Sequence, residues 1–221
     1  MDKVFWLEKW QQGQIGFHQQ EYNAYLTESW HVLGVPNSST VFVPLCGKSL
    51  DMLWLRGQGH HVIGVEVSEQ ACLAFFQENG LEYERHREEP FDVYQAQGIT
   101  IYCGDFFAFN AKHVSDVAVV YDRASMVAMP EELRQRYAAH LRQILPGTTP
   151  IFLVTMEYEQ AQMDGPPFSV LQQDVEQAYA DVYAIQRVLK KNVLDDNERF
   201  RERGVTALAE LAEAVYVLRP K

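Results

Sequence analysis

From residue 40 onward, short runs of apolar and β-branched residues alternate with longer segments in which apolar residues recur every three or four positions. Runs of the first kind predict buried strands, and segments of the second kind predict helices. Strands are expected at 40–45 (TVFVPL) and 61–67 (HVIGVEV), with a helix over 49–56 that ends near Gly57 and Gly59. This order is typical of a βαβ unit.

The segment after the second strand carries helix start and stop signals. Ser68 is a suitable N-cap, and Gly80 suits the left-handed conformation that ends many helices. Ala71, Phe75 and Phe76 recur at helical spacing and are expected to face the core. The segment therefore predicts a helix that packs one apolar face against the sheet.

The rest of the chain continues the alternation. After a charged stretch at 82–89 that is expected to be irregular, the remaining elements are strands at 99–103, 117–122 and 149–158, a helix opened by Pro130, a helix near 171–180, a strand at 182–194, a helix around 205–213 and a closing strand at 214–220. The last two strands are expected to form an antiparallel pair.

The fold class is therefore α/β: a Rossmann-like, doubly wound, mostly parallel sheet with helices on both faces and an antiparallel edge strand. Because no linker divides the chain, residues 1–221 are expected to form a single domain.

The N-terminal segment stands apart from this pattern because it precedes the first strand and is rich in aromatic side chains. They are Phe5, Trp6, Trp10, Phe17, Tyr22, Tyr25 and Trp30. Such a segment suits a covering role over another part of the domain.

Composition narrows the classes of function. The chain has 221 residues, 47% of them hydrophobic, and a formal net charge of -11, so a nucleic-acid partner is not expected. Cys46, Cys72 and Cys103 lack CxxC spacing, which indicates neither a disulfide framework nor a metal site. No segment has the apolar length of a signal peptide or a membrane span. We expect a soluble cytoplasmic protein with no membrane partner, acting as a monomer.

Candidate chemistry lies after the strands, because doubly wound sheets bind ligands outside the carboxyl ends of their strands. In the turn PLCGKS, Gly47 lets the backbone approach a ligand, although an ordinary strand-to-helix turn explains it equally well. Glu66 ends the second strand about twenty residues past that turn, where an acidic side chain accepts hydrogen bonds from both ribose hydroxyls of a nucleotide. Its alternative role is to favour the N-terminus of the next helix. We favour the ribose role.

Two later strand ends also carry polar residues. Gly104 and Asp105, followed by Phe106, form a place where a polar group and an aromatic ring can meet a flat ligand ring, with core packing as the alternative for the phenylalanine. Asp122 and Arg123 close another apolar strand. An arginine there can stabilise an anion, and a local Asp–Arg ion pair is the alternative.

Five segments together carry a resemblance to a known family. They are WLEKWQQGQIGFHQ (6–19), VPLCGKSLDMLWL (43–55), GHHVIGVEVSEQA (59–71), VVYDRASMVAMP (119–130) and GPPF (165–168). In this order, over nearly the whole chain, they resemble the thiopurine S-methyltransferase family of Rossmann-like methyltransferases, and its compact bacterial branch in particular. The resemblance implies S-adenosyl-L-methionine as the methyl donor, S-adenosyl-L-homocysteine as the product, and a small thiol or chalcogen compound as the acceptor.

The resemblance also implies site residues. The implied cofactor contacts are Trp6, Trp10, Leu45, Glu66, Asp105, Phe106 and Arg123, and the implied acceptor contacts are Phe17 and Arg199. Residues 1–35 would then form a helical cover over the cofactor site. Arg123 is the catalytic candidate, since its charge can stabilise an anionic acceptor. No metal ligand is implied.

The implied reaction is in-line displacement at the sulfonium methyl, in which the enzyme mainly positions donor and acceptor and excludes water. Its expected acceptors are thiopurines or other small aromatic and heterocyclic thiols, with selenium or tellurium compounds as further candidates. A nicotinamide-dependent dehydrogenase is the enzymatic alternative, but it requires GxGxxG where this chain has PLCGKS. A non-catalytic protein that senses the cofactor or sequesters metalloid is the other alternative, which fold alone does not exclude.

Overall fold

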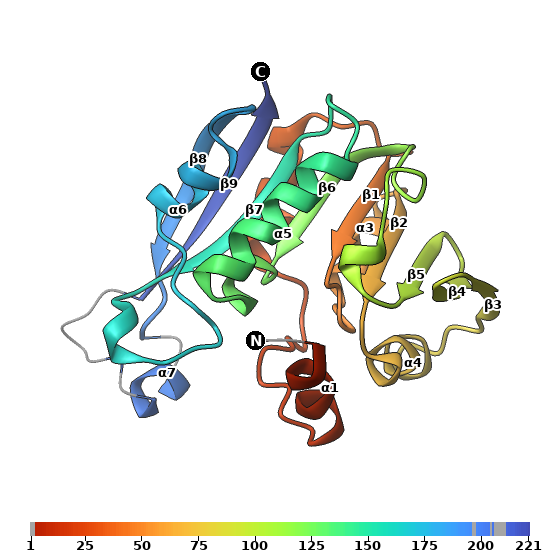
Figure 1. Cartoon of the computed structure of the whole chain (residues 1–221), viewed down its shortest axis with the longest axis horizontal. Helices are drawn as coiled ribbons and strands as arrows, with labels where there is room; N and C mark the ends of the chain where they lie inside the picture. The colour runs from red at the N-terminus through yellow and green to blue at the C-terminus, as the bar shows by residue number, and fades with distance from the viewer. Residues whose placement is uncertain (1–2, 196–197, 204, 206–210) are drawn as a thin grey trace. The chain divides into compact units, whose positions relative to one another are not determined.

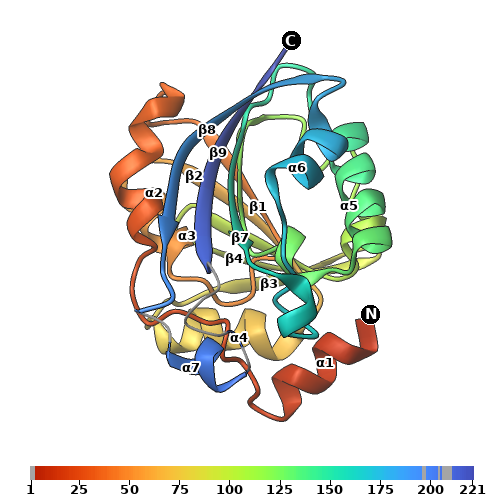
Figure 2. The same ribbon diagram turned by 90° about the vertical axis from the view of Figure 1, so that its left-hand side faces the viewer.

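The computed structural model describes residues 3–195, 198–203, 205 and 211–221, with only the backbone at 198–199. The chain forms two compact units. One comprises Met1–Tyr121 with Ile144–Pro146, and the other comprises Asp122–Gln143 with Gly147–Lys221. Figures 1 and 2 together label their α-helices and strands.

Parallel strands form the centre of the first unit. β1 (Thr40–Pro44) pairs in parallel with both β2 (His61–Glu66) and β6 (Val117–Arg123), and β2 pairs in parallel with β5 (Ile99–Cys103). These pairings confirm the predicted parallel arrangement. Because parallel strands end at the same edge of a sheet, the residues that follow β1, β2 and β5 lie along one edge.

Two helices pack against the middle of this sheet. α3 (Asp51–Gly57) and α4 (Glu69–Glu78) both contact β2. The predicted cap of α4 is confirmed, because the Ser68 hydroxyl oxygen accepts a hydrogen bond from the Ala71 N–H at 3.2 Å. The inward-facing aromatic positions of this helix are also confirmed, since Phe75 and Phe76 are fully buried.

The N-terminal segment is helical, as expected. It contains α1 (Lys3–Gln11), α2 (Ala24–Ser29) and the 3-10 helix η1 (Trp30–Leu33). Two views place α1 beside α4 (Figures 1 and 2), and the two helices are in contact. This contact places α1 against the helix that follows β2.

A hairpin replaces the irregular stretch that was expected at 82–89. β3 (Glu84–Glu88) pairs antiparallel with β4 (Phe91–Ala96), which in turn pairs with β5. The prediction is wrong because all of β3 is exposed, so this edge strand has no apolar alternation to reveal it. In the first unit the strand order is β3-β4-β5-β2-β1-β6.

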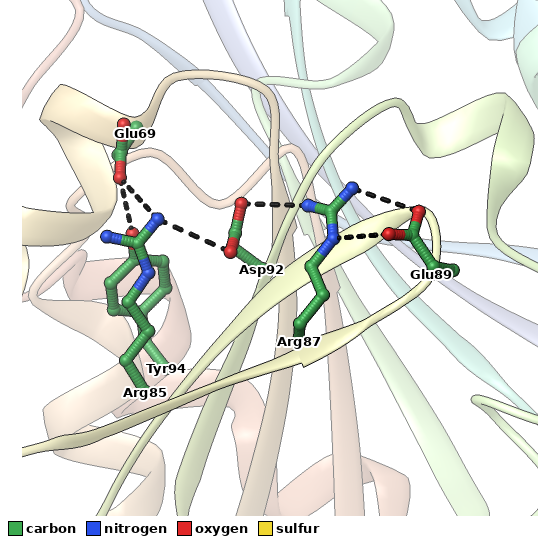
Figure 3. Close-up of polar contacts among 6 residues, drawn as sticks. All are labelled: Glu69, Arg85, Arg87, Glu89, Asp92 and Tyr94. Atoms are coloured by element: carbon green, nitrogen blue, oxygen red, sulfur yellow. Dashed lines mark hydrogen bonds and ion pairs between the residues drawn. The ribbon is translucent and has the colours of Figure 1, made fainter.

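Polar contacts tie this hairpin to α4 (Figure 3). The Tyr94 hydroxyl donates to Glu69 at 2.8 Å, and the Arg85 guanidinium lies 3.0 Å from the same carboxylate. The Asp92 carboxylate forms ion pairs with the guanidinium groups of Arg85, at 3.3 Å, and of Arg87, at 2.9 Å. Arg87 also forms an ion pair with Glu89. Exposed ion pairs are screened by water and contribute little, so we attribute the stability of the hairpin mainly to burial of the apolar residues of β4.

Antiparallel strands form the sheet of the second unit. β9 (Ala212–Pro220) pairs antiparallel with both β7 (Ile151–Glu157) and β8 (Tyr183–Asn192), and Figure 2 shows the three strands side by side. The predicted antiparallel pairing of the last two strands is thus confirmed. The helical elements of this unit are η3 (Met126–Ala128), α5 (Glu131–Ile144), η4 (Gln160–Gln162), α6 (Gln172–Tyr179) and α7 (Glu198–Glu202).

The prediction of a helix around 205–213 is wrong at the two ends of that range, which the structure describes. Ala212 already belongs to β9, where it pairs with Glu157 of β7 and Asn192 of β8, and Val205 lies outside any helix. Pairing on both sides of β9 favours the extended conformation at Ala212. Positions 206–210 lie outside the described residues. In the part of the chain that the structure describes, no helix is long and apolar enough to cross a membrane.

Gly104, which directly follows β5, has no room for a side chain. A Cβ added there would lie 2.4 Å from Cδ1 of the fully buried Phe91 ring. Because overpacking a core costs about 1–3 kcal/mol, Gly104→Ala is expected to lower the free energy of unfolding by about 2 kcal/mol in urea denaturation. Gly57→Ala is the control, since nothing lies within 4 Å of its Cβ position. Equal stability of the Gly104 variant and the wild type would contradict this account.

Candidate cofactor and acceptor site

The turn after β1 has an unusual backbone. Leu45 has a φ of +47° and Gly47 a φ of +53°, both in the left-handed region. This conformation is strained for leucine, at a cost on the order of 1–3 kcal/mol, and natural for glycine. The Cys46 N–H donates to the Val65 carbonyl at 3.1 Å, which holds the turn against the end of β2. Strained backbone of this kind clusters at ligand sites.

Glu66 is the acidic group at this edge of the sheet. Its side chain is buried, and each carboxylate oxygen accepts one backbone hydrogen bond: from the Gly47 N–H at 2.9 Å and from the Ser68 N–H at 2.8 Å. Burial raises the pKa of Glu66, and these N–H groups oppose that rise because they stabilise the carboxylate. A carboxylate oxygen has two lone pairs, so each can still accept from one hydroxyl of a vicinal diol.

The end of β5 joins the same edge. The Gly104 N–H donates to the Glu66 backbone carbonyl at 2.8 Å, which places Asp105 and Phe106 directly beyond it along the chain. The exposed Asp105 accepts from the Phe107 N–H at 2.9 Å and so caps η2 (Phe106–Ala108). The Phe106 ring is only 3% exposed, so it has little surface with which to stack on a ligand.

Aromatic residues of the N-terminal segment gather beside the turn after β1. Trp10 is buried, and its ring lies 3.4 Å from the position that a Cβ on Gly47 would occupy. Phe17 meets the rings of both Trp6 and Trp10 edge-on, with centroids 5.6 Å apart in each pair, yet it keeps 40% of its surface exposed. Trp6, Trp10 and Phe17, the three aromatic residues of this segment that the resemblance implies, thus form one cluster in which the Phe17 ring is partly exposed to solvent.

Sequence reasoning missed the residue that anchors this N-terminal segment. Asp51 is buried and accepts from the Asn23 N–H and from the Tyr121 hydroxyl, both at 2.8 Å. It therefore links the segment before α2 to α3 and β6. An aspartate at the start of a helix has a common local explanation, so the sequence pattern alone does not point to this tertiary role.

The second unit begins with the candidate pair Asp122 and Arg123. Asp122 is fully buried and accepts from the Tyr137 hydroxyl at 2.6 Å, so it is not an exposed carboxylate. Arg123 is half-buried, and Ala124 after it has a φ of +76°. Arg199 lies in α7, and its side chain is outside the described residues.

Asp122 gives a pH-dependent contribution to stability. Burial raises its pKa to about 6, although hydrogen bonds from Tyr137 and Ser125 oppose that rise. Between pH about 4 and about 6 the folded protein keeps a proton that the unfolded chain loses, so rising pH lowers the free energy of unfolding. The pKa change is equivalent to about 3 kcal/mol.

The neutral variant Asp122→Asn lacks this titration but keeps an acceptor for the Tyr137 hydroxyl. From pH 4 to pH 7, wild type is expected to lose about 2 kcal/mol of stability relative to the variant in urea denaturation, because part of the titration of the unfolded chain already lies below pH 4. Parallel pH profiles of the two proteins would show that Asp122 does not titrate in this way.

Comparison with known proteins assigns the chain to a family. The family model described as thiopurine S-methyltransferase matches residues 1–221. The thiopurine S-methyltransferase of Nitrosospira multiformis is 49% identical over 210 residues, covering 95% of this chain and 96% of the relative. That of Pseudomonas fluorescens Pf0-1 is 45% identical, with the same coverage of both chains.

Solved structures resemble the fold at low sequence identity. The 1,6-didemethyltoxoflavin-N1-methyltransferase of Burkholderia thailandensis, solved with S-adenosylhomocysteine, has a TM-score of 0.63 at 12% identity, over 99% of this chain and 87% of its own. A TehB-like methyltransferase from Corynebacterium glutamicum has a TM-score of 0.57 at 13% identity, over 99% and 98%. These likenesses confirm the predicted Rossmann-like methyltransferase fold. By the match of the whole sequence, the chain belongs to the thiopurine S-methyltransferase family.

Proposed function

We propose that this protein transfers the methyl group of S-adenosylmethionine to the sulfur of a small aromatic or heterocyclic thiol, thiopurines included, by in-line displacement. The observation that carries the proposal is the buried Glu66 carboxylate, fixed by the Gly47 and Ser68 N–H groups at the carboxyl edge of the parallel strands. Family membership supports both the methyl donor and the thiol acceptor.

The residues at this edge fit an adenosyl group. Glu66 keeps lone pairs for the two ribose hydroxyls, and the left-handed turn at Leu45 and Gly47 lets main chain rather than side chain approach the ligand. Asp105 is exposed one position beyond Gly104, available to a polar edge of the adenine. When bound, S-adenosylmethionine supplies an electrophilic methyl group on a positively charged sulfur.

The chain's own residues position the reactants and exclude water. The aromatic cluster of Trp6, Trp10 and Phe17 presents ring surfaces that attract a cation and cover the ligand, with the exposed Phe17 contacting the acceptor. Arg123 and Arg199 interact with the acceptor, and the Arg123 charge favours its thiolate form. A thiolate is a strong nucleophile, so the reaction needs no dedicated general base.

Selenium and tellurium compounds are further proposed acceptors, since they are soft nucleophiles like thiolates. We also propose that the protein acts in the cytoplasm as a monomer on small molecules, without a nucleic-acid or membrane partner. The net charge of -11, which disfavours a polyanionic partner, and the three free cysteines support this setting.

Isothermal titration with S-adenosylmethionine and S-adenosylhomocysteine, followed by a methyl-transfer assay, tests the proposal. The assay compares thiopurines, simple aromatic thiols, and selenium and tellurium compounds. Binding with turnover of a thiol is the expected result. Binding without turnover of any acceptor would favour a cofactor-sensing protein, and absence of binding would refute the cofactor assignment.

A further inference from the structure

All three cysteines of the chain surround the end of β2. Cys46 follows β1, and its Sγ lies 2.7 Å from the position that a Cβ on Gly64 would occupy. Cys103 ends β5 directly opposite Glu66 in the parallel register, so its side chain is on the same face of the sheet as Glu66 and Gly64. Cys72 lies on α4, the helix that contacts both β2 and β5. The thiols thus converge on one face beside the candidate ribose carboxylate.

Two of these thiols form an interacting pair. The Cys72 thiol, on the helix that contacts β5, donates a hydrogen bond to the Cys103 sulfur; Cys72 is buried and Cys103 is partly exposed. This bond lowers the pKa of Cys103, although burial and nearby carboxylates oppose the change. Burial raises the pKa of Cys46, so that thiol is the less reactive neighbour.

We infer that Cys103 and Cys72 form an oxidative modification site, in which a hydroperoxide converts the partly exposed thiol of Cys103 to a sulfenic acid, which then reacts with Cys72 to form a disulfide. The Cys103 thiolate attacks one peroxide oxygen, the O–O bond breaks, and the other oxygen leaves as water or an alcohol after gaining a proton. The Cys72 sulfur then attacks the sulfenic sulfur, and the hydroxyl leaves as water with the proton of Cys72. The two thiols lose two electrons, which the peroxide gains.

The disulfide would alter the candidate cofactor site. Forming a bond of about 2.05 Å draws the end of β5 toward the first turn of α4. Those are the segments that carry Asp105 and Ser68, and the Ser68 N–H holds the Glu66 carboxylate. Oxidation is therefore expected to weaken S-adenosylhomocysteine binding at least tenfold. This consequence rests on the proposed function, whereas the modification itself does not.

The modification is tested on the full-length protein with hydrogen peroxide. After treatment, the protein is denatured, alkylated with N-ethylmaleimide and measured by intact-mass and peptide mapping. Wild type is expected to carry one adduct instead of three, with a cross-link between the peptides of Cys72 and Cys103. Cys46→Ser is expected to form the same cross-link. Cys72→Ala is expected to form none and instead to gain oxygen at Cys103, with Cys72→Ser as the substitute if the alanine variant does not fold.

Three adducts on treated wild type, or a cross-link through Cys46, would overturn the inference. Isothermal titration then compares the reduced, oxidised and dithiothreitol-treated forms with S-adenosylhomocysteine. Weaker binding that dithiothreitol restores supports the effect on the site, and equal binding by the disulfide form refutes it. If the reduced protein does not bind S-adenosylhomocysteine, the proposed function is refuted. The number of N-ethylmaleimide adducts still shows whether the Cys72–Cys103 disulfide forms.

Discussion

Replacing Glu66 with glutamine is expected to weaken S-adenosylhomocysteine binding by roughly a hundredfold or more. Hydrogen bonds to a charged group contribute about 1.5–3 kcal/mol each, and every 1.4 kcal/mol is about tenfold in affinity, so weakening the two proposed ribose hydrogen bonds accounts for this loss. The glutamine NH₂ would also face the N–H of either Gly47 or Ser68, donor against donor. The measurement is isothermal titration at neutral pH.

Glu69→Gln is the matched control for this substitution. Glu69 stands three positions further along, half-exposed, and contacts Tyr94 and Arg85 on the hairpin rather than the turn after β1. Its variant is expected to bind S-adenosylhomocysteine like wild type. Because burial raises the pKa of Glu66, wild-type affinity is also expected to fall as acid protonates this group. If a folded Glu66→Gln protein bound S-adenosylhomocysteine with wild-type affinity, the proposed contact of Glu66 with the ribose would be refuted.

The parallel part of the fold is predictable because its signals are local. The β-branched runs at 40–45 and 61–67, the Ser68 cap and the buried faces of α4 all combine strong periodicity with turn chemistry. β3 is not predicted because an exposed edge strand has no buried face and therefore no alternation of apolar and polar residues. The helix predicted to continue to 213 fails because pairing with β7 and β8 outweighs local propensity at Ala212.

The positions of the candidate site residues are predictable to a similar degree and for related reasons, while their roles stay predictions. Glu66 follows from its spacing after the first turn, which chain topology fixes. The left-handed conformations at Leu45 and Ala124 leave no sequence signal, because neither residue favours them. The bonds of Asp51 to Asn23 and Tyr121, and of Asp122 to Tyr137, join residues distant in sequence, so only the folded chain reveals them.

Arg123 is the residue whose removal is expected to affect turnover most, because its proposed role is exerted on the acceptor. Arg123→Ala is expected to lower kcat/KM for a thiopurine by about a hundredfold at neutral pH, which corresponds to about 2.7 kcal/mol of lost transition-state stabilisation. Without the cation the acceptor thiol ionises less readily, so the pH profile of kcat/KM should shift to higher pH. Affinity for S-adenosylhomocysteine is expected to change less than turnover.

A thiol series separates this electrostatic role from a structural one. If Arg123 favours the thiolate, the defect of Arg123→Ala should shrink for acceptors that are already ionised at the assay pH, and Arg123→Lys should recover part of the rate because it keeps the charge. Arg136→Ala, an exposed arginine on α5, serves as the control and should retain wild-type turnover. A uniform loss across all acceptors, with an unshifted pH profile, would mean that Arg123 supports the turn after β6 rather than the acceptor anion.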